Sequence, residues 1–247
     1  MRKWLRSRFT HNRWVFHTAL FPILGGPMRG LRWSCVSGGK LLRVLRGTYE
    51  VKQTQLVWQS LGAGDTFIDV GAHHGYYTML ASRAVGSNGM VMAFEPDPRN
   101  AFLLRGHVHA NALSNTCVVE SAVANHQGMV LFAAGTGTGT GAISQKGTLP
   151  VQVTTLDHEL LSRKLVPTHI KIDVEGAEVD VLKGAKEVLS RYRPTLFLST
   201  HGARVKAACC HLLREMGYCL APIDGEDFTE STELYCQHVE QLERKAA

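Results

Sequence analysis

The feature that most constrains the fold is a glycine-containing turn that directly follows a short apolar segment. Residues 66–70 read as a strand, the run Asp69-Val-Gly-Ala-His-His-Gly75 overlaps its end, and a helical pattern begins at Tyr76. Glycines at a strand-to-helix turn let the backbone approach a ligand, and the N-terminus of the helix lies beside it. The pattern therefore favours an α/β fold with a ligand site at this turn.

The chain after residue 66 alternates between strand-like and helix-like segments, which is typical of a mostly parallel sheet with helices on both faces. We expect further strands at 90–94, 117–123, 128–133, 151–155, 169–174, 195–199, 218–221 and 234–239, and helices at 76–84, 98–110, 177–191 and 204–216. The last two strands are expected to pair. The Gly/Thr-rich run 135–141 is either a flexible connector or a mobile lid over the substrate.

The basic residues are concentrated at the start of the chain. Of the 27 Lys and Arg residues, ten lie in residues 1–46, which contain no acid. We therefore divide the chain into a basic arm at 1–46 and a main domain at 47–247. Such an arm can contact an anionic membrane or a phosphorylated carrier, or it can be a solvated extension.

The chain is expected to be cytoplasmic, with membrane association through the arm as an open alternative. The apolar stretch at 15–24 contains Pro22 and is followed by Gly25-Gly26-Pro27, which is not a signal-peptidase site. No apolar run is long enough to span a bilayer. The six cysteines have no regular spacing, so we expect reduced thiols rather than a disulfide framework or a zinc site.

Two acidic residues suggest which ligand the turn binds. Asp69 precedes the first glycine, where an acid suits a positively charged amino group better than a pyrophosphate. Glu95 ends the strand at 90–94 and can accept both ribose hydroxyls of an adenosine cofactor. S-adenosylmethionine carries both groups. The spacing D-x-G-x-x-x-G differs from G-x-G-x-x-G, which disfavours a nicotinamide oxidoreductase.

A third motif, Ile170-Lys-Ile-Asp-Val-Glu-Gly-Ala-Glu178, places two more acids at the end of a strand. Asp173 and Glu175 should lie at the carboxyl edge of the sheet, where open α/β sheets bind ligands. They could bind a cofactor, hold a metal, take a proton or cap the next helix.

These motifs resemble the FkbM family of methyltransferases. The resemblance covers about residues 47–201 through GTYE, TFIDVGAHHGYYTMLAS, AFEPDP, VTTLDHEL, IKIDVEGAEVDVLKGA and RPTLFLSTHG, in that order. It implies a Rossmann-like class I methyltransferase sheet of seven mostly parallel strands over the main domain. It also implies S-adenosylmethionine as cofactor and transfer of methyl to a hydroxyl oxygen of a sugar or small metabolite, such as a glycan, glycolipid or natural product.

The expected site combines the motifs with the resemblance. The expected cofactor-binding residues are Glu50, Asp69, Gly71, Ala72, His73, Gly75, Tyr76, Glu95, Pro96, Ala122 and Asp173. The expected catalytic residues are His201, Glu175 and Asp173, and we assign no metal. His201 follows the strand at 195–199, and an imidazole of ordinary pKa, about 6.5, suits proton acceptance.

Two departures from the family pattern leave alternatives open. His73 stands where the family usually has Asn, and Ser199 stands where it usually has Glu. A missing acid is compatible with a different acceptor or with a cofactor-binding protein that has no turnover. The basic arm suggests an RNA or DNA methyltransferase, but no N-P-P-F or D-P-P-Y run follows the fourth strand. We therefore expect a small-molecule or carbohydrate acceptor rather than nucleic acid.

Overall fold

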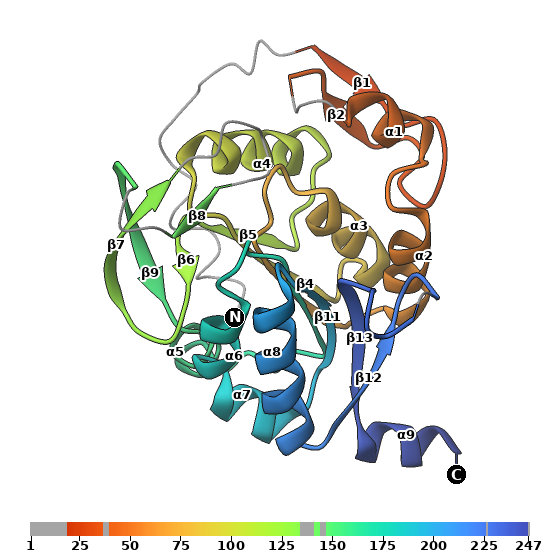
Figure 1. The fold of residues 1–247 in the computed structure, drawn as a ribbon. Helices are drawn as coiled ribbons and strands as arrows, with labels where there is room; N and C mark the ends of the chain where they lie inside the picture. The colour runs from red at the N-terminus through yellow and green to blue at the C-terminus, as the bar shows by residue number, and fades with distance from the viewer. Residues whose placement is uncertain (1–18, 37–39, 134–140, 144–146, 226, 247) are drawn as a thin grey trace.

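The computed structural model describes residues 19–36, 40–133, 141–143, 147–225 and 227–246, and its centre is a seven-stranded sheet (Figure 1). The strand order is β12-β13-β11-β10-β3-β4-β5, and within this sheet only β13 runs against its neighbours. The strands are β3 (Thr66–Val70), β4 (Met90–Phe94), β5 (Thr116–Val119), β10 (His169–Ile172), β11 (Thr195–Ser199), β12 (Tyr218–Pro222) and β13 (Glu233–His238). The expected mostly parallel sheet of seven strands is confirmed, as is the closing pair.

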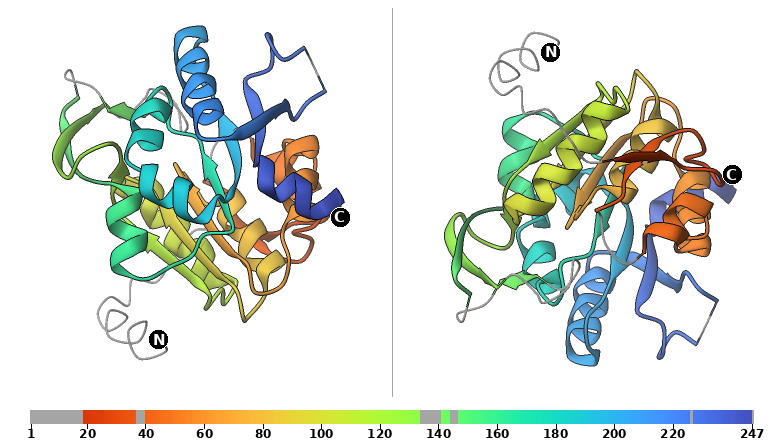
Figure 2. Two further views of the ribbon diagram at one scale, coloured as in Figure 1. Left: turned by 90° about the horizontal axis from the view of Figure 1, so that it is seen from below. Right: turned by 90° about the horizontal axis from the view of Figure 1, so that it is seen from above.

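Helices cover both faces of the sheet (Figure 2). One face carries α2 (Val51–Ser60), α3 (Tyr76–Val85) and α4 (Pro98–Ala110), and the other carries α5 (Leu156–Ser162), α6 (Glu178–Lys183), α7 (Lys186–Tyr192) and α8 (Ala203–Glu215). Successive side chains of a strand point to opposite faces. Phe67 therefore packs in the core beneath α3, whereas Ile68 packs in the core beneath α5 to α8. A short α9 (Val239–Ala246) ends the described chain.

The prediction of one strand over 117–123 is wrong. The main-sheet strand β5 ends at Val119, and Ser121 turns the chain into a second sheet, where its Oγ donates to the carbonyl of Gln152 at 3.1 Å. This second sheet has the order β6-β9-β7-β8 and lies to the left in Figure 1. Its strands are β6 (Ala122–Val123), β7 (Gly128–Ala133), β8 (Ala142–Ile143) and β9 (Leu149–Thr154). Residues 134–140, which hold most of the expected lid, lie outside the described residues.

The single helix expected over 177–191 is also wrong, because the chain breaks into α6 and α7 around Gly184. The carbonyl of Gly184 accepts from the backbone N–H of Asp157 at 2.9 Å and so leaves the helical ladder. A Cβ at Gly184 would lie 2.0 Å from the carbonyl oxygen of Ala124. The break and the missing side chain of Gly184 therefore let the start of α5 and the chain after β6 lie close to the junction of α6 and α7.

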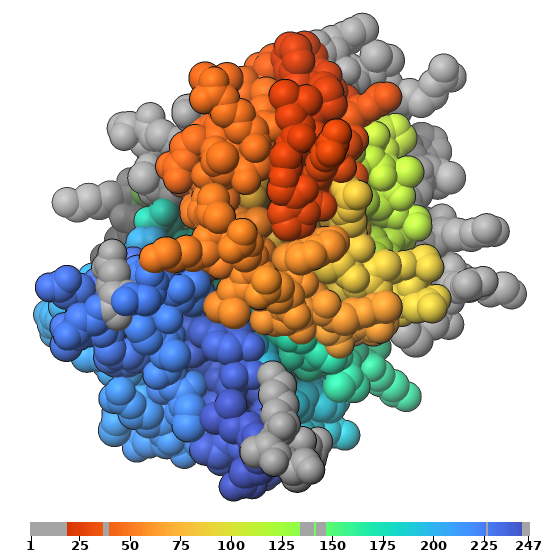
Figure 3. Space-filling view, turned by 90° about the vertical axis from the view of Figure 1, so that its right-hand side faces the viewer, coloured from red at the N-terminus to blue at the C-terminus, as the bar shows by residue number. Residues whose placement is uncertain are grey.

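The described part of the basic arm packs onto the body. It forms β1 (Leu20–Pro22), β2 (Arg32–Ser34) and α1 (Leu41–Arg46), and Figure 3 shows it in red and orange beside the yellow and yellow-green of α3 and α4. Trp33 is 3% exposed and stacks on His107 of α4 with ring centroids 4.1 Å apart. Trp33 and Val44 share a core with α3, so this core crosses the boundary expected at residues 46 and 47. None of the described helices combines the length and the apolar character that crossing a bilayer requires.

Candidate functional site

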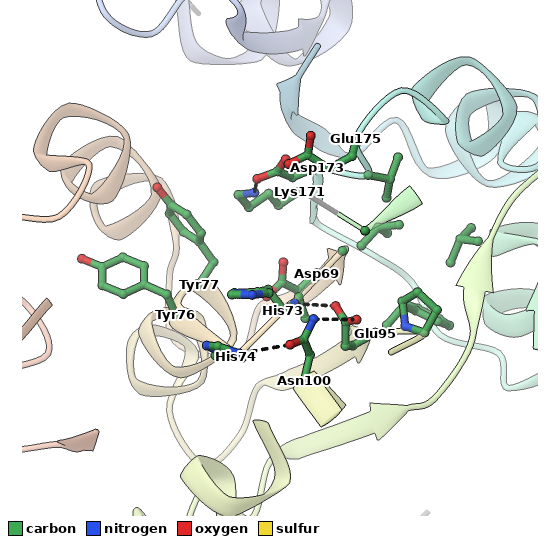
Figure 4. A pocket seen from close by; sticks show the side chains of 18 of the residues that line it. Asp69, His73, His74, Tyr76, Tyr77, Glu95, Asn100, Lys171, Asp173 and Glu175 are labelled. Carbon is green, nitrogen blue, oxygen red and sulfur yellow. Dashed lines mark hydrogen bonds and ion pairs between the residues drawn. The ribbon is translucent and has the colours of Figure 1, made fainter. Parts of the chain in front are cut away.

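A cavity of about 350 Å³ lies at the carboxyl edge of the parallel strands, between the ends of β3, β4, β10 and β11. This volume is in the range of small-molecule sites. Figure 4 shows Asp69 between Glu95 on one side and Asp173 and Glu175 on the other. The expected residues that line it are Glu50, Asp69, Gly71, Ala72, His73, Tyr76, Glu95, Pro96, Ala122, Asp173, Glu175 and His201. The three motifs therefore meet in one place.

The glycine turn passes tightly between two strands. Gly71 has φ +84°, and a Cβ there would lie 1.9 Å from the carbonyl oxygen of Asp173. The N–H groups of Gly71 and Ala72 both donate to the carbonyl of Phe94, at 3.0 and 2.9 Å. Gly75 does not line the cavity. It has φ +88°, and a Cβ built there would lie 2.2 Å from the side chain of Leu104. Its role is therefore to allow close packing.

The carboxylate of Glu95 is fixed by the turns around it. Its Oε2 accepts from the N–H of His73 at 2.7 Å, and its Oε1 accepts from the N–H of Asp97 at 2.9 Å. Asn100 Nδ2 donates more weakly to Oε1, at 3.4 Å (Figure 4). Burial raises the pKa of Glu95 to about 7 although these bonds oppose the rise. The side chain is therefore held in one orientation, facing the cavity.

Negative and positive side chains alternate along the floor of the cavity, in the order Asp69, Lys171 and Asp173. Asp69 is 1% exposed and its Oδ2 accepts from Thr78 Oγ1 at 2.6 Å. Lys171, also buried, lies beside Asp69 in the register of β3 and β10 and donates to Asp173 Oδ2 at 2.8 Å. Burial raises the pKa of Asp69. At Asp173 burial also favours a higher pKa, but Lys171, together with the charges of His201 and Lys40, outweighs it and lowers the pKa. The sequence reasoning missed Lys171, although a lysine inside an apolar strand was a visible signal.

His201 is enclosed by three carboxylates. Its Nδ1 lies 2.8 Å from Glu178 Oε1, and its Nε2 lies 3.4 Å from Glu175 Oε2 and 3.8 Å from Asp173 Oδ1. The hydrogen bond to Glu178, helped by the other two charges, raises the pKa of His201 to about 9. This pKa is well above that of the ordinary imidazole that we expected from the sequence, so the ring is a poor proton acceptor at neutral pH.

A further acid reaches the cavity from a strand that no motif marked. Glu233 of β13 pairs in register with Ser199 of β11, and Ser199 Oγ donates to its Oε2 at 2.7 Å. Gln53 Nε2 donates to the same oxygen at 2.8 Å, while Gln53 Oε1 accepts from the Tyr77 hydroxyl at 2.5 Å. The sequence reasoning missed Glu233 because only the sheet order brings it beside Ser199.

The sheet order and the cavity at its carboxyl edge define a class I methyltransferase fold. Solved structures agree: methyltransferase FkbM from Methylobacillus flagellatus KT is 20% identical with a TM-score of 0.55, over 79% of this chain and 52% of that one. A putative rRNA-methylase from Clostridium thermocellum is 9% identical with a TM-score of 0.51, over 75% and 92%. This chain thus spans about half the length of the first structure.

The sequence match narrows the class to a family. The Methyltransferase FkbM domain matches residues 69–220, from the acid before the glycine turn to the middle of β12. The chain therefore belongs to the FkbM methyltransferase family. Among curated proteins, no sequence matches it significantly.

Proposed function

We propose that this chain is an S-adenosylmethionine-dependent O-methyltransferase that acts on a hydroxyl group of a sugar or another small metabolite. The observation that carries the proposal is the division of one cavity into two different edges. A cofactor edge contains Glu95 and the glycine turn, and an acceptor edge contains Asp173, Glu175, His201 and Glu233.

The cofactor edge fits an adenosyl ligand. Glu95 presents a fixed carboxylate that can accept ribose hydroxyls, and at Gly71 the backbone lies against the cavity with no side chain in between. His73 lines the same part of the cavity, and its backbone N–H holds the carboxylate of Glu95 in place. Burial lowers the pKa of His73 to about 3, so its neutral ring would not repel a positively charged ligand.

The acceptor edge fits a neutral molecule that carries several hydroxyls. Carboxylate oxygens of Asp173, Glu175 and Glu233 can accept hydrogen bonds from such groups. Tyr77 lines the same cavity. The same charges oppose a phosphate backbone, which is the main source of nucleic-acid affinity. This favours a sugar or metabolite acceptor over RNA or DNA.

The carboxylate beside Ser199 supports an enzyme rather than a binding protein without turnover. Ser199 itself has no charge, yet Glu233 supplies a carboxylate within hydrogen-bond distance of it, at 2.7 Å. The edge of the cavity at β11 therefore keeps an acid although the strand does not carry one.

The residues of the chain would act mainly by positioning. When bound, the cofactor would supply a methyl group carried on a positively charged sulfur, with the neutral thioether as the leaving group. Asp173, Glu175 and His201 lie together at the acceptor edge, where all three can orient the hydroxyl and the carboxylate of Glu175 can receive its proton.

The test combines binding with transfer. Calorimetry should show one S-adenosylmethionine bound per chain, and methyl-labelled cofactor with a cell extract should label the small-molecule or carbohydrate fraction. Label in the nucleic-acid fraction would favour the alternative acceptor. Cofactor binding with no labelled fraction would indicate a binding protein, and absence of cofactor binding would refute the proposal.

A further inference from the structure

One group of side chains at the acceptor edge has the composition of a metal site. Asp173, Glu175 and His201 each offer a ligand atom, and these atoms all lie within 4.8 Å of one another. Two of the separations are 3.4 and 3.8 Å, both measured from His201 Nε2. Ligands at about 2.1 Å from one ion lie about 3.0–3.5 Å apart, so only small side-chain rotations are needed.

The imidazole is oriented as a metal-binding imidazole would be. A metal-ligating His usually gives its second ring nitrogen to a carboxylate, which fixes the tautomer and aims the other nitrogen at the ion. Here Nδ1 of His201 lies 2.8 Å from Glu178 Oε1, and Glu178 is itself held by the N–H of Gly176 at 3.0 Å. Nε2 of His201 is thereby directed toward Asp173 and Glu175.

Three carboxylates surround the ring of His201, and one of them is only partly satisfied by the described residues. Glu178 is fully buried, and its Oε2 has no partner among the described residues. Lys171 binds Oδ2 of Asp173, which leaves Oδ1 on the side of His201. Buried carboxylates are costly unless they are paired or coordinate a cation. A divalent cation that replaces the proton on His201 Nε2 would therefore be stabilised here.

We propose that Asp173, Glu175 and His201 bind one divalent transition-metal ion, with Glu178 orienting His201 from behind. Two carboxylate oxygens and one imidazole nitrogen suit ions such as Mn²⁺ or Zn²⁺ better than Ca²⁺, which prefers oxygen ligands alone. All three residues line the cavity, so an ion held by them would be open to a ligand in it. There an ion would bind an acceptor oxygen and make its hydroxyl more acidic. This role rests on the proposed function, whereas the metal site itself does not.

The test is a titration of the full chain with Mn²⁺, followed by calorimetry and electron paramagnetic resonance. One Mn²⁺ should bind per chain, and His201→Ala and Glu175→Gln should each weaken binding by about tenfold or more. His211→Ala is the matched control, because His211 also faces a carboxylate, Glu215 at 3.5 Å, but on the exposed surface of α8. This control should bind Mn²⁺ like the parent chain.

Two further measurements separate the possible failures. Circular dichroism melting checks that each variant is folded, and Glu175→Gln keeps the shape of the side chain if His201→Ala does not fold. Absence of stoichiometric Mn²⁺ or Zn²⁺ binding by the parent, or equal binding by the folded variants, would overturn the metal site. Metal binding without methyl transfer by the parent would instead leave the site standing and count against the proposed function.

Discussion

The two edges of the cavity are built in different ways. The cofactor edge comes from one stretch of chain, Asp69 to Glu95, and is shaped largely by backbone groups, such as the N–H of His73 on Glu95. The acceptor edge comes from α2, β10, β11, β13 and the turns after β10 and β11. Side chains such as Gln53, Ser199 and Glu233 hold it together. A backbone-built edge tolerates little change, whereas a side-chain-built edge can be altered without refolding.

The largest effect is expected where the backbone is most crowded. Gly71→Ala should reduce the free energy of unfolding by about 4 kcal/mol, because the new Cβ meets the carbonyl oxygen of Asp173 at a left-handed φ of +84°. Gly64→Ala is the control, since Gly64 has φ +92°, close to that of Gly71, but open space around it. It should cost only about 1 kcal/mol. Urea unfolding followed by circular dichroism measures both, and equal costs would contradict a close approach at Gly71.

The second effect tests the carboxylate of the cofactor edge. Glu95→Gln should weaken S-adenosylmethionine binding about 30-fold, because a charged acceptor of ribose hydroxyls becomes a neutral amide. Glu120→Gln removes an acid of the exposed ion pair with Arg105 and should leave affinity unchanged. Calorimetry measures the cofactor affinity of both variants. An unchanged affinity in Glu95→Gln would show that Glu95 does not bind the cofactor.

The third effect tests whether the acceptor edge can be rearranged. Glu233→Ser should slow methyl transfer about tenfold, with cofactor affinity within about twofold of the parent, because only the acceptor edge loses a charge. The double variant Ser199→Glu, Glu233→Ser returns a carboxylate from the paired position on β11 and should recover much of the rate. Rates are measured as cofactor product released with the extract fraction that accepts label. A Glu233→Ser variant as fast as the parent would exclude Glu233 from the site.

The smallest effect is a pH dependence confined to the cofactor edge. Because the pKa of Glu95 is about 7, most of its carboxyl is protonated at pH 6 and ionised at pH 8. Cofactor affinity should therefore rise with pH, by about sevenfold between these values if the protonated form binds about as weakly as the amide. Calorimetry at several pH values measures this rise. The rise should disappear in Glu95→Gln, and a rise of the same size in that variant would assign the dependence to another group.

Much of the fold could be predicted because it follows from local patterns. The helix at Pro98–Ala110 and the strands at Thr66–Val70 and Met90–Phe94 have the expected bounds. Predictions failed where a distant partner took over a hydrogen-bonding group. Ser121 turns toward Gln152 of β9, and the carbonyl of Gly184 goes to Asp157.

The sequence by itself determined the cofactor edge. A turn at the end of a strand is a local structure. The positions of Asp69, the glycines and Glu95 at the ends of β3 and β4 could therefore be predicted from the sequence. Only the tertiary structure decided the acceptor edge. Glu233 reaches the cavity because β13 is inserted against β11, and the pKa of His201 is raised because Glu178 lies against its ring. The charge state and the neighbours of these side chains depend on burial and on contacts between distant segments, which no local pattern of residues encodes.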